Sequence, residues 1–183
     1  MDADRTVLDI DLEEEAKRIC DFIRIQVLSR YKRKGVVVGL SGGVDSALLA
    51  CLCVRALGSD NVLGVLLPEK ESSPESASFA VEQAQSLGIR HKEFDITPIL
   101  TAFGVYEKRN RVVSTLCEDF DPEVDAMKIV LPPDLLENDA LNVFSLIVEK
   151  TDGQRFSYRL KPNQVNEIVA AQNVKQRTRM VQL

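Results

Sequence analysis

One stretch, Gly35 to Ala50, constrains the fold of this 183-residue chain more than any other. Val36 to Leu40 is a short apolar run rich in β-branched residues, which predicts a buried strand. Ser41 to Asp45 then contains two adjacent glycines, where a chain can turn sharply, and from Ser46 the apolar spacing predicts a helix. A strand, a glycine loop and a helix N-terminus present free backbone amides to one point. Such an arrangement predicts an anion site, and the natural anion is a phosphate.

The residues around this stretch alternate between helix and strand patterns. An amphipathic helix is predicted for Asp11 to Lys34, closed by Gly35, and a second for Ser76 to Leu87. Apolar runs at Val62 to Leu67 and Ile89 to Ile96 predict two more strands. Three strands alternating with helices indicate parallel βαβ units, whose ligands bind beyond the carboxyl ends of the strands. We therefore expect an α/β, Rossmann-like fold with a parallel sheet and flanking helices.

From about Gly104 the pattern becomes weaker. Residues 105–136 carry mixed charge, and the acidic cluster from Glu118 to Asp125 is most simply a solvated loop. Two further strands, joined as a hairpin, and a final helix with one apolar face are predicted here. Their residues are Asn142 to Lys150 and Arg155 to Lys161 for the strands, and Pro162 onward for the helix, with Val165, Ile168, Val169 and Val174 on its face.

Composition excludes several classes of protein. The net charge of -5 argues against nonspecific nucleic-acid binding, and no apolar run approaches the roughly 20 residues that span a bilayer. The first residues lack the pattern of a signal peptide, so a cytoplasmic location is expected. The four cysteines form no CxxC pair, which favours buried free thiols over a metal site or disulfides. His91, the single histidine, is predicted to be structural.

The glycine loop can be compared with known phosphate loops. It has no lysine before Ser46, as a Walker A loop requires, and no third glycine, as a dinucleotide fingerprint requires. The sequence Ser41-Gly-Gly-Val-Asp-Ser46 instead resembles the SGGxDS pyrophosphate loop of the ATP pyrophosphatases, and the alternative is a tight turn without a ligand. The resemblance implies an ATP site formed by Gly39, Leu40, Ser41, Gly42, Gly43, Val44, Asp45 and Ser46.

Asp45 is the most informative residue of this loop. A carboxylate beside a polyphosphate is repelled unless a cation lies between them, so we interpret Asp45 as a Mg²⁺ ligand. The alternative is a favourable acid in the first turn of a helix, worth about 0.3–1 kcal/mol. The family resemblance favours the metal.

Three more segments are similar to NAD synthetase. They are Asn61 to Pro68 with the serines that follow, Asp95 to Ile99, and Asn173-Val-Lys-Gln-Arg-Thr-Arg-Met180, in which Gln176 replaces the usual alanine. With the glycine loop, they cover about half to two-thirds of the chain.

This resemblance implies ATP-dependent adenylation of deamido-NAD and amidation to NAD, with ammonia supplied directly or from glutamine by another domain or chain. It implies no protein nucleophile, a homodimer, and substrate binding by Arg177 and Arg179. For both arginines the alternative is a solvated basic helix end.

Two departures from the family are visible. About 75 residues separate the third strand from the arginine-rich helix, which predicts an insertion at about 105–161 within a single domain, 1–183. The family's later segment, with a second metal acid, is absent by residue 183. The domain is thus expected to be incomplete at its C-terminus, and this chain alone is expected to bind ATP weakly and to turn over slowly or not at all. Other adenylating enzymes of the superfamily, similar to GMP synthetase or acting in sulfur transfer, and a non-catalytic nucleotide-binding module remain alternatives.

Overall fold

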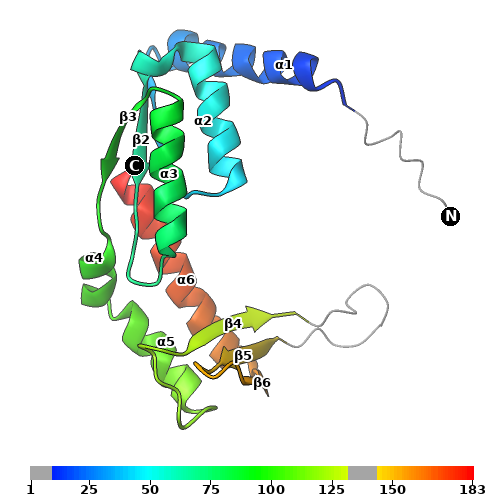
Figure 1. Ribbon diagram of the computed structural model, residues 1–183, viewed down its shortest axis with the longest axis vertical. Helices are drawn as coiled ribbons and strands as arrows, with labels where there is room; N and C mark the ends of the chain where they lie inside the picture. The colour runs from blue at the N-terminus through cyan, green and yellow to red at the C-terminus, as the bar shows by residue number, and fades with distance from the viewer. Residues whose placement is uncertain (1–9, 132–143) are drawn as a thin grey trace, which may run out of the picture. The chain divides into compact units, whose positions relative to one another are not determined.

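The computed structural model describes residues 10–131 and 144–183, and Figure 1 follows the chain along them. Their strands form two sheets of three strands each. The chain divides into two compact units, one reaching to Thr97 and including Leu183, the other covering Pro98–Gln182. No helix among these residues combines the length and apolar character needed to cross a membrane.

The sheet of the first unit is parallel and runs in the order β1-β2-β3. Its strands are β1 (Val36–Gly39), β2 (Val62–Leu66) and β3 (Arg90–Glu93). Two helices connect them, α2 (Val44–Leu57) and α3 (Pro74–Ser86), with the short η3 (Ser59–Asn61) before β2. Both crossovers step in the same direction, so right-handed connections place both helices on one face of the sheet. This confirms the α/β fold with a parallel sheet that the sequence predicts.

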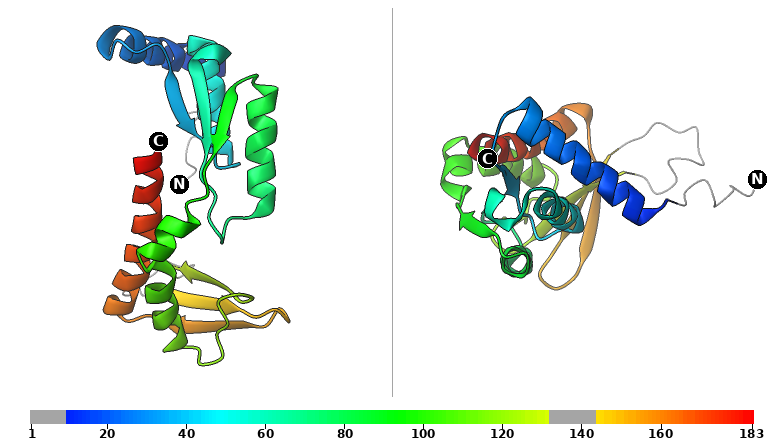
Figure 2. Two further views of the ribbon diagram at one scale, coloured as in Figure 1. Left: turned by 90° about the vertical axis from the view of Figure 1, so that its left-hand side faces the viewer. Right: turned by 90° about the horizontal axis from the view of Figure 1, so that it is seen from above.

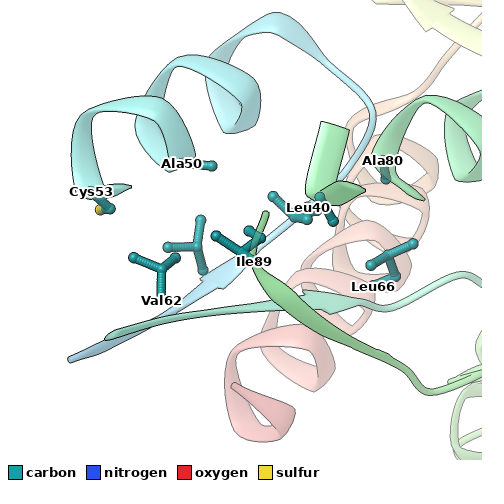
Figure 3. Close-up of a cluster of buried hydrophobic side chains, with 9 residues drawn as sticks. Leu40, Ala50, Cys53, Val62, Leu66, Ala80 and Ile89 are labelled. Carbon is teal, nitrogen blue, oxygen red and sulfur yellow. The ribbon is translucent and has the colours of Figure 1, made fainter. Parts of the chain in front are cut away.

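The core of the first unit lies between these helices and the sheet. Figure 3 shows small side chains of the helices, Ala50 and Cys53 of α2 and Ala80 of α3, against larger aliphatic side chains of the strands. Small residues let a helix approach the sheet closely, and Leu40 and Val62 fill the space between.

The first helix is shorter than its periodicity predicts. α1 (Leu12–Arg24) begins at Asp11, whose side chain accepts bonds from the amides of Glu13 and Glu14, each at 3.0 Å. It passes into a π-helical segment, η2 (Ile25–Arg30). The predicted end at Lys34, closed by Gly35, is wrong. Lys32 adopts a left-handed conformation with φ 52°, which already ends the helix.

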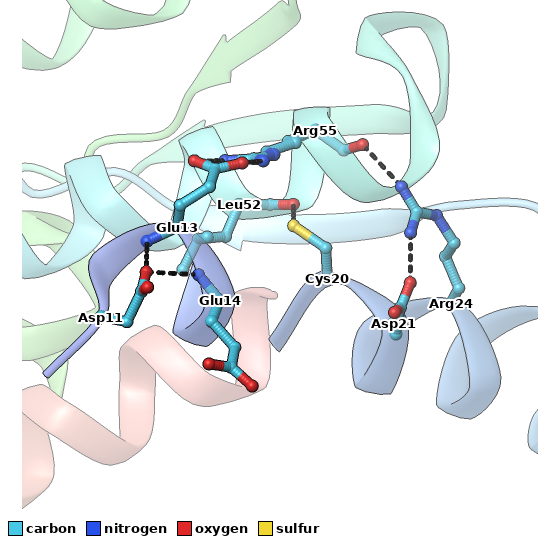
Figure 4. Close-up of polar contacts among 8 residues, drawn as sticks. All are labelled: Asp11, Glu13, Glu14, Cys20, Asp21, Arg24, Leu52 and Arg55. Carbon is cyan, nitrogen blue, oxygen red and sulfur yellow. Dashed lines mark hydrogen bonds and ion pairs between the residues drawn. The ribbon is translucent and has the colours of Figure 1, made fainter. Parts of the chain in front are cut away.

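Polar contacts hold α1 on α2, which it crosses in the view from above (Figure 2). Arg24 donates to the backbone carbonyls of Ala56 (2.9 Å) and Arg55 (3.1 Å) at the C-terminal end of α2, where carbonyls lack helix partners. Arg55 in turn pairs with Glu13 (Figure 4). Along α1, Leu12 is 74% exposed, whereas Cys20 is buried and its thiol donates to the carbonyl of Leu52.

The second unit is built on an antiparallel sheet, β4-β5-β6. The elements of this unit are α4 (Thr97–Ala102), α5 (Val105–Ser114), β4 (Ala126–Val130), β5 (Ser145–Glu149), β6 (Arg155–Arg159) and α6 (Pro162–Gln182). The first residue of α4, Thr97, is the last residue of the first unit before Leu183. Its core joins Val113 and Cys117 with Leu146 and Val148 of β5 and Ile168 of α6. The predicted hairpin is therefore confirmed as β5 and β6, and the final helix as α6. Residues 142–143 of the predicted first strand lie outside the described residues.

Two elements of this unit were not predicted, and two predictions about single residues are wrong. Residues 105–114 form a helix and 126–130 a third strand, where weak periodicity indicated neither. Val169 is 40% exposed rather than on the buried face of α6. Asp125, expected in a solvated acidic loop, is almost buried and pairs with Lys150 at 2.7 Å.

The cysteines largely follow expectation, because all four are free thiols and three of them are buried. Cys51 is the exception and is exposed, since it faces away from the sheet on α2. Burial, reinforced by the neighbouring Cys20, raises the pKa of the Cys53 thiol. A neutral, shielded thiol of this kind is a packing residue rather than a nucleophile.

Candidate functional site

The glycine loop connects β1 to α2 in the first unit. The ladder to β2 extends one residue beyond β1, because the Leu40 amide donates to the carbonyl of Val65 at 2.9 Å. Gly43 is the N-cap of α2 and has no side chain to occupy that end of the helix. The strand, the turn and the helix N-terminus thus occur in the order that the sequence predicts, beyond the carboxyl end of a parallel strand.

Ser46 organises the loop from inside. Its hydroxyl donates to the carbonyl of Gly43 (2.9 Å) and accepts from the amide of Ser41 (3.2 Å). The two serine hydroxyls lie 3.1 Å apart, and the proton between them comes from Ser41 because that of Ser46 is already donated. In this conformation both hydroxyl protons stabilise the loop. The backbone amides are therefore the donors that stand ready for an anion.

Those amides are at the first turn of α2. The first bond of the helical ladder is donated by Ala47 to the carbonyl of Gly43, at 3.1 Å. The amides of Val44, Asp45 and Ser46 precede it and have no partner within the helix. Together with the positive end of the helix dipole, these three N–H groups make a site suited to one phosphate-sized anion.

Gly42 brings a second helix to the loop. Its φ is +77°, and a Cβ built on it would overlap the carbonyl of Ser76 in the first turn of α3. Ser73 is the N-cap of α3 and accepts from the Ser76 amide at 3.4 Å. A glycine is needed at position 42 both for its conformation and for this approach, which brings the first turn of α3 against the loop.

Asp45 stands in the first turn of α2 and is exposed. Its carboxylate makes no hydrogen bond or ion pair with another residue of the described part. Among the described residues, the loop included, no three acidic, histidine or cysteine side chains gather around one point. A Mg²⁺ ion here would take one carboxylate from the protein and its other oxygens from phosphates and water, a donor set that Mg²⁺ commonly uses.

Asp95 follows β3 at the same end of the sheet. Its carboxylate accepts from the amide of Thr97 at 2.8 Å, and hydrogen bonding from Thr97 holds the pKa of Asp95 below its ordinary value. The segment Asp95 to Ile99 thus ends the sheet and starts α4 through an aspartate turn. In this structure the Asp95 carboxylate therefore stabilises the turn that leads into α4.

Arg177 and Arg179, the two predicted substrate-binding residues, lie on α6 in the second unit. Arg177 is exposed, and Arg179 is half-buried. Lys175, two residues earlier, is buried, with its ammonium 5.1 Å from the ring centre of Tyr106 on α5. The same motif therefore presents one cation to α5 and another to the surface.

One cation near Arg177 was missed by the sequence analysis. Lys108 of α5 lines the same groove as Arg177. No sequence signal could have identified it, since Lys108 is an ordinary polar residue on a helix that the periodicity did not predict.

More than half of this chain is similar to a known protein family. The sequence profile described as NAD synthase matches residues 15–120. The chain belongs to the NAD synthase family. The matched residues contain the glycine loop, all three strands of the parallel sheet and α5.

Curated relatives match over different lengths. The NH(3)-dependent NAD(+) synthetase of Mesorhizobium japonicum is 41% identical over 173 residues, 94% of this chain and 54% of the relative. The protein of the same description from Methanocaldococcus jannaschii is 50% identical over 93 residues, 51% of this chain and 36% of the relative. The chain spans about half the length of the Mesorhizobium protein.

Among solved structures, the NH3-dependent NAD synthetase from Campylobacter jejuni is 34% identical. The match covers 57% of this chain and 50% of that chain, with a TM-score of 0.48.

Proposed function

We propose that this chain takes part in the ATP-dependent amidation of deamido-NAD to NAD, with its first unit binding ATP. The glycine loop carries the proposal: three unpartnered helix amides, a glycine with φ +77° and a free carboxylate meet at one strand end. Membership of the NAD synthase family, and relatives described as NH(3)-dependent NAD(+) synthetases, support deamido-NAD and ammonia as the substrates.

The proposed chemistry has two steps. An oxygen of the nicotinate carboxylate attacks the α-phosphorus of ATP, the α–β phosphoanhydride bond breaks, and pyrophosphate leaves. Ammonia then attacks the acyl carbon of the adenylate, AMP leaves with the carbon–oxygen bonding electrons, and a proton is lost. Neither step uses a protein nucleophile.

In this scheme the loop acts on the pyrophosphate. The amides of Val44, Asp45 and Ser46 hold one phosphate of the leaving pyrophosphate and stabilise charge as it moves to that group. Gly39 to Gly43 let the backbone approach the phosphates, and the hydroxyls of Ser41 and Ser46 bind them once the internal bonds of the loop open. Asp45 would hold Mg²⁺, which supplies charge neutralisation when bound.

On α6, Arg177 and Arg179 are proposed to bind deamido-NAD, because guanidinium groups suit an acidic dinucleotide. The single domain with an insertion at about 105–161 also stays a proposal. It is supported by relatives that match 94% of the chain in one case and about half in another. The homodimer and the cytoplasmic location remain predictions from the sequence.

Calorimetry with ATP and Mg²⁺ tests the ATP site. Asp45→Asn keeps the size of the side chain but removes its charge, and we expect it to weaken ATP binding at least about tenfold in Mg²⁺. With EDTA present, the two proteins should differ far less. Asp60→Asn, an exposed acid outside the loop, is the matched control and should bind like the unmodified chain. Equal affinities of the unmodified chain and Asp45→Asn in Mg²⁺ would contradict the metal role.

The substrate is tested by pyrophosphate release from ATP. Deamido-NAD should trigger release, whereas xanthosine monophosphate should not. The reverse result would indicate that the chain takes part in a reaction like that of GMP synthetase instead.

A further inference from the structure

Two buried thiols of the first unit have no part in the proposed chemistry. Cys20 lies on α1 and Cys53 on α2, and their exposed fractions are 1% and 4%. Both helices belong to the same unit, and α1 packs on α2. This thiol pair, Cys20 and Cys53, therefore lies where two helices that are distant in the sequence come together.

The Cys20 side chain is directed at α2. Its thiol donates to the carbonyl of Leu52 at 3.6 Å, and that carbonyl belongs to the peptide bond that Leu52 shares with Cys53 (Figure 4). Packed helices have axes about 8–10 Å apart, and each Cα lies about 2.3 Å from its axis, so facing residues have Cα atoms about 3.5–5.5 Å apart. This range overlaps the Cα separation of about 4.4–6.8 Å that a disulfide bridges.

Both thiols are shielded while α1 packs on α2. Burial, and then the neighbouring Cys20, raise the pKa of the Cys53 thiol, so Cys53 is neutral and unreactive in this arrangement. A reaction with an oxidant in solution therefore requires α1 to move away from α2.

The contacts of α1 with α2 favour such local opening. Besides the bonds from Arg24, they include the Glu13–Arg55 ion pair, in which both side chains are exposed. Exposed ion pairs contribute little to stability, and the apolar side chains of Leu12 and Phe22 on α1 are also exposed. Opening of α1 alone should thus require less free energy than unfolding of the whole unit.

We propose that Cys20 and Cys53 are a redox-sensitive pair, which an oxidised low-molecular-weight disulfide of the glutathione class converts into a disulfide between α1 and α2. The disulfide fixes α1 on α2, and a thiol reductant releases it. This inference does not depend on the proposed function.

The oxidation proceeds by two thiol–disulfide exchanges. When α1 opens, the Cys20 thiolate attacks one sulfur of oxidised glutathione, and the first glutathione thiol leaves. While α1 is still partly open, Cys53 loses its proton to water and attacks the Cys20 Sγ of the mixed disulfide, and the second glutathione thiol leaves. The two cysteines together lose two electrons and two protons, which convert one oxidised glutathione into two thiols.

The test incubates the 183-residue chain with oxidised glutathione and identifies disulfides by mass spectrometry of unreduced peptides. Cys20→Ala and Cys53→Ala each remove one thiol of the pair and leave a small apolar side chain. Cys51→Ala removes the exposed thiol of α2 and is the matched control.

The unmodified chain and Cys51→Ala should both yield peptides linked through Cys20 and Cys53, whereas Cys20→Ala and Cys53→Ala should form no internal disulfide. Amide hydrogen exchange in α1 should be at least about tenfold slower in the oxidised chain than in the reduced chain, because the cross-link opposes local opening. Dithiothreitol should restore the faster exchange. Oxidised glutathione should not slow the exchange of α1 in Cys20→Ala.

Two results would overturn the proposal. One is an unmodified chain in which Cys20 and Cys53 stay free or carry only glutathione. The other is a Cys20–Cys53 disulfide that leaves hydrogen exchange in α1 unchanged. Both results are obtained with the unmodified chain, so the test stands even where an alanine variant fails to fold.

Discussion

The two units reach a three-stranded sheet by different routes, which explains why one was easier to anticipate. In the first unit the strands are parallel, and each connection contains a helix that packs on the strands it joins. In the second unit the strands are antiparallel, and β4 is separated from its partner β5 by residues 131–144. Local signals therefore determine much of the first sheet, whereas pairing across a long separation determines the second.

The largest predicted effect of a substitution concerns the hydrophobic core of the second unit. Leu146 is completely buried in β5, and Leu146→Ala should destabilise its unit by about 3 kcal/mol through lost contacts and a cavity. If the units are energetically separate, ATP binding by the first unit should not change. Hydrogen exchange measured amide by amide will report the stability of each unit.

The matched variant in the first unit is Val62→Ala, which opens a smaller cavity in the parallel-sheet core. It should lower protection in the first unit alone. Equal loss of protection in both units from either variant would show that they unfold as one cooperative body, contrary to the division described above.

An intermediate effect is expected at the glycine loop. Gly42→Ala introduces a side chain at φ +77° and into the carbonyl of Ser76, and should cost about 2–3 kcal/mol and abolish ATP binding. Gly88→Ala also has a positive φ, +62°, but its Cβ meets nothing within 4 Å, so it should cost only about 1–2 kcal/mol and leave ATP binding intact. Urea unfolding and calorimetry measure the two quantities. If the two variants bind ATP equally well, the approach of α3 to the loop is unimportant for the site.

The smallest effect expected concerns the pH dependence of the second unit. The hydrogen bond from Lys150 lowers the pKa of Asp125 below its ordinary value of 3.8, and the same contact raises the pKa of Lys150. A lowered carboxyl pKa stabilises the folded state above the ordinary value, and this contribution is lost as the pH falls through the lowered value. Lys150 stays charged throughout that range. Asp125→Asn should therefore reduce the free energy of unfolding at pH 7. Below about pH 4, the free energy of unfolding of this variant should fall less steeply than that of the unmodified chain.

Urea midpoints between pH 7 and pH 3 measure this difference. Glu149→Gln, which removes the partner of the exposed Arg155, is the control and should change the midpoint little. A decline of equal steepness in Asp125→Asn and the unmodified chain would assign the acid sensitivity to other carboxyl groups.

Much of the first unit could be read from the sequence because its signals are local. The β-branched run from Val36, the paired glycines and the apolar helix after Ser46 act within a few residues, and the structure shows strand, turn and helix in that order. The end of α1 could not be predicted, because Lys32 adopts a left-handed conformation that usually indicates glycine or asparagine.

The second unit was predicted only where its periodicity is strong, in β5, β6 and α6. Strand β4 contains Met127, Lys128 and Ile129, and only pairing with β5 makes this short alternation a strand. Ion pairs in this unit likewise depend on which distant segments come together. Asp125 looked like one solvated acid among several until Lys150, 25 residues later, was brought to 2.7 Å from it.

By itself, the sequence determined that this chain has a parallel α/β sheet with a glycine loop at Ser41 to Ser46, and it indicated the family. Those conclusions rest on residue types whose conformational or chemical preference acts at their own position. Only the tertiary structure decided that Gly42 meets the first turn of α3, that the serine hydroxyls bond to each other, and that Lys108 joins Arg177 in one groove. Each of these depends on which distant segments fold against one another, and that is decided by packing rather than by local preference.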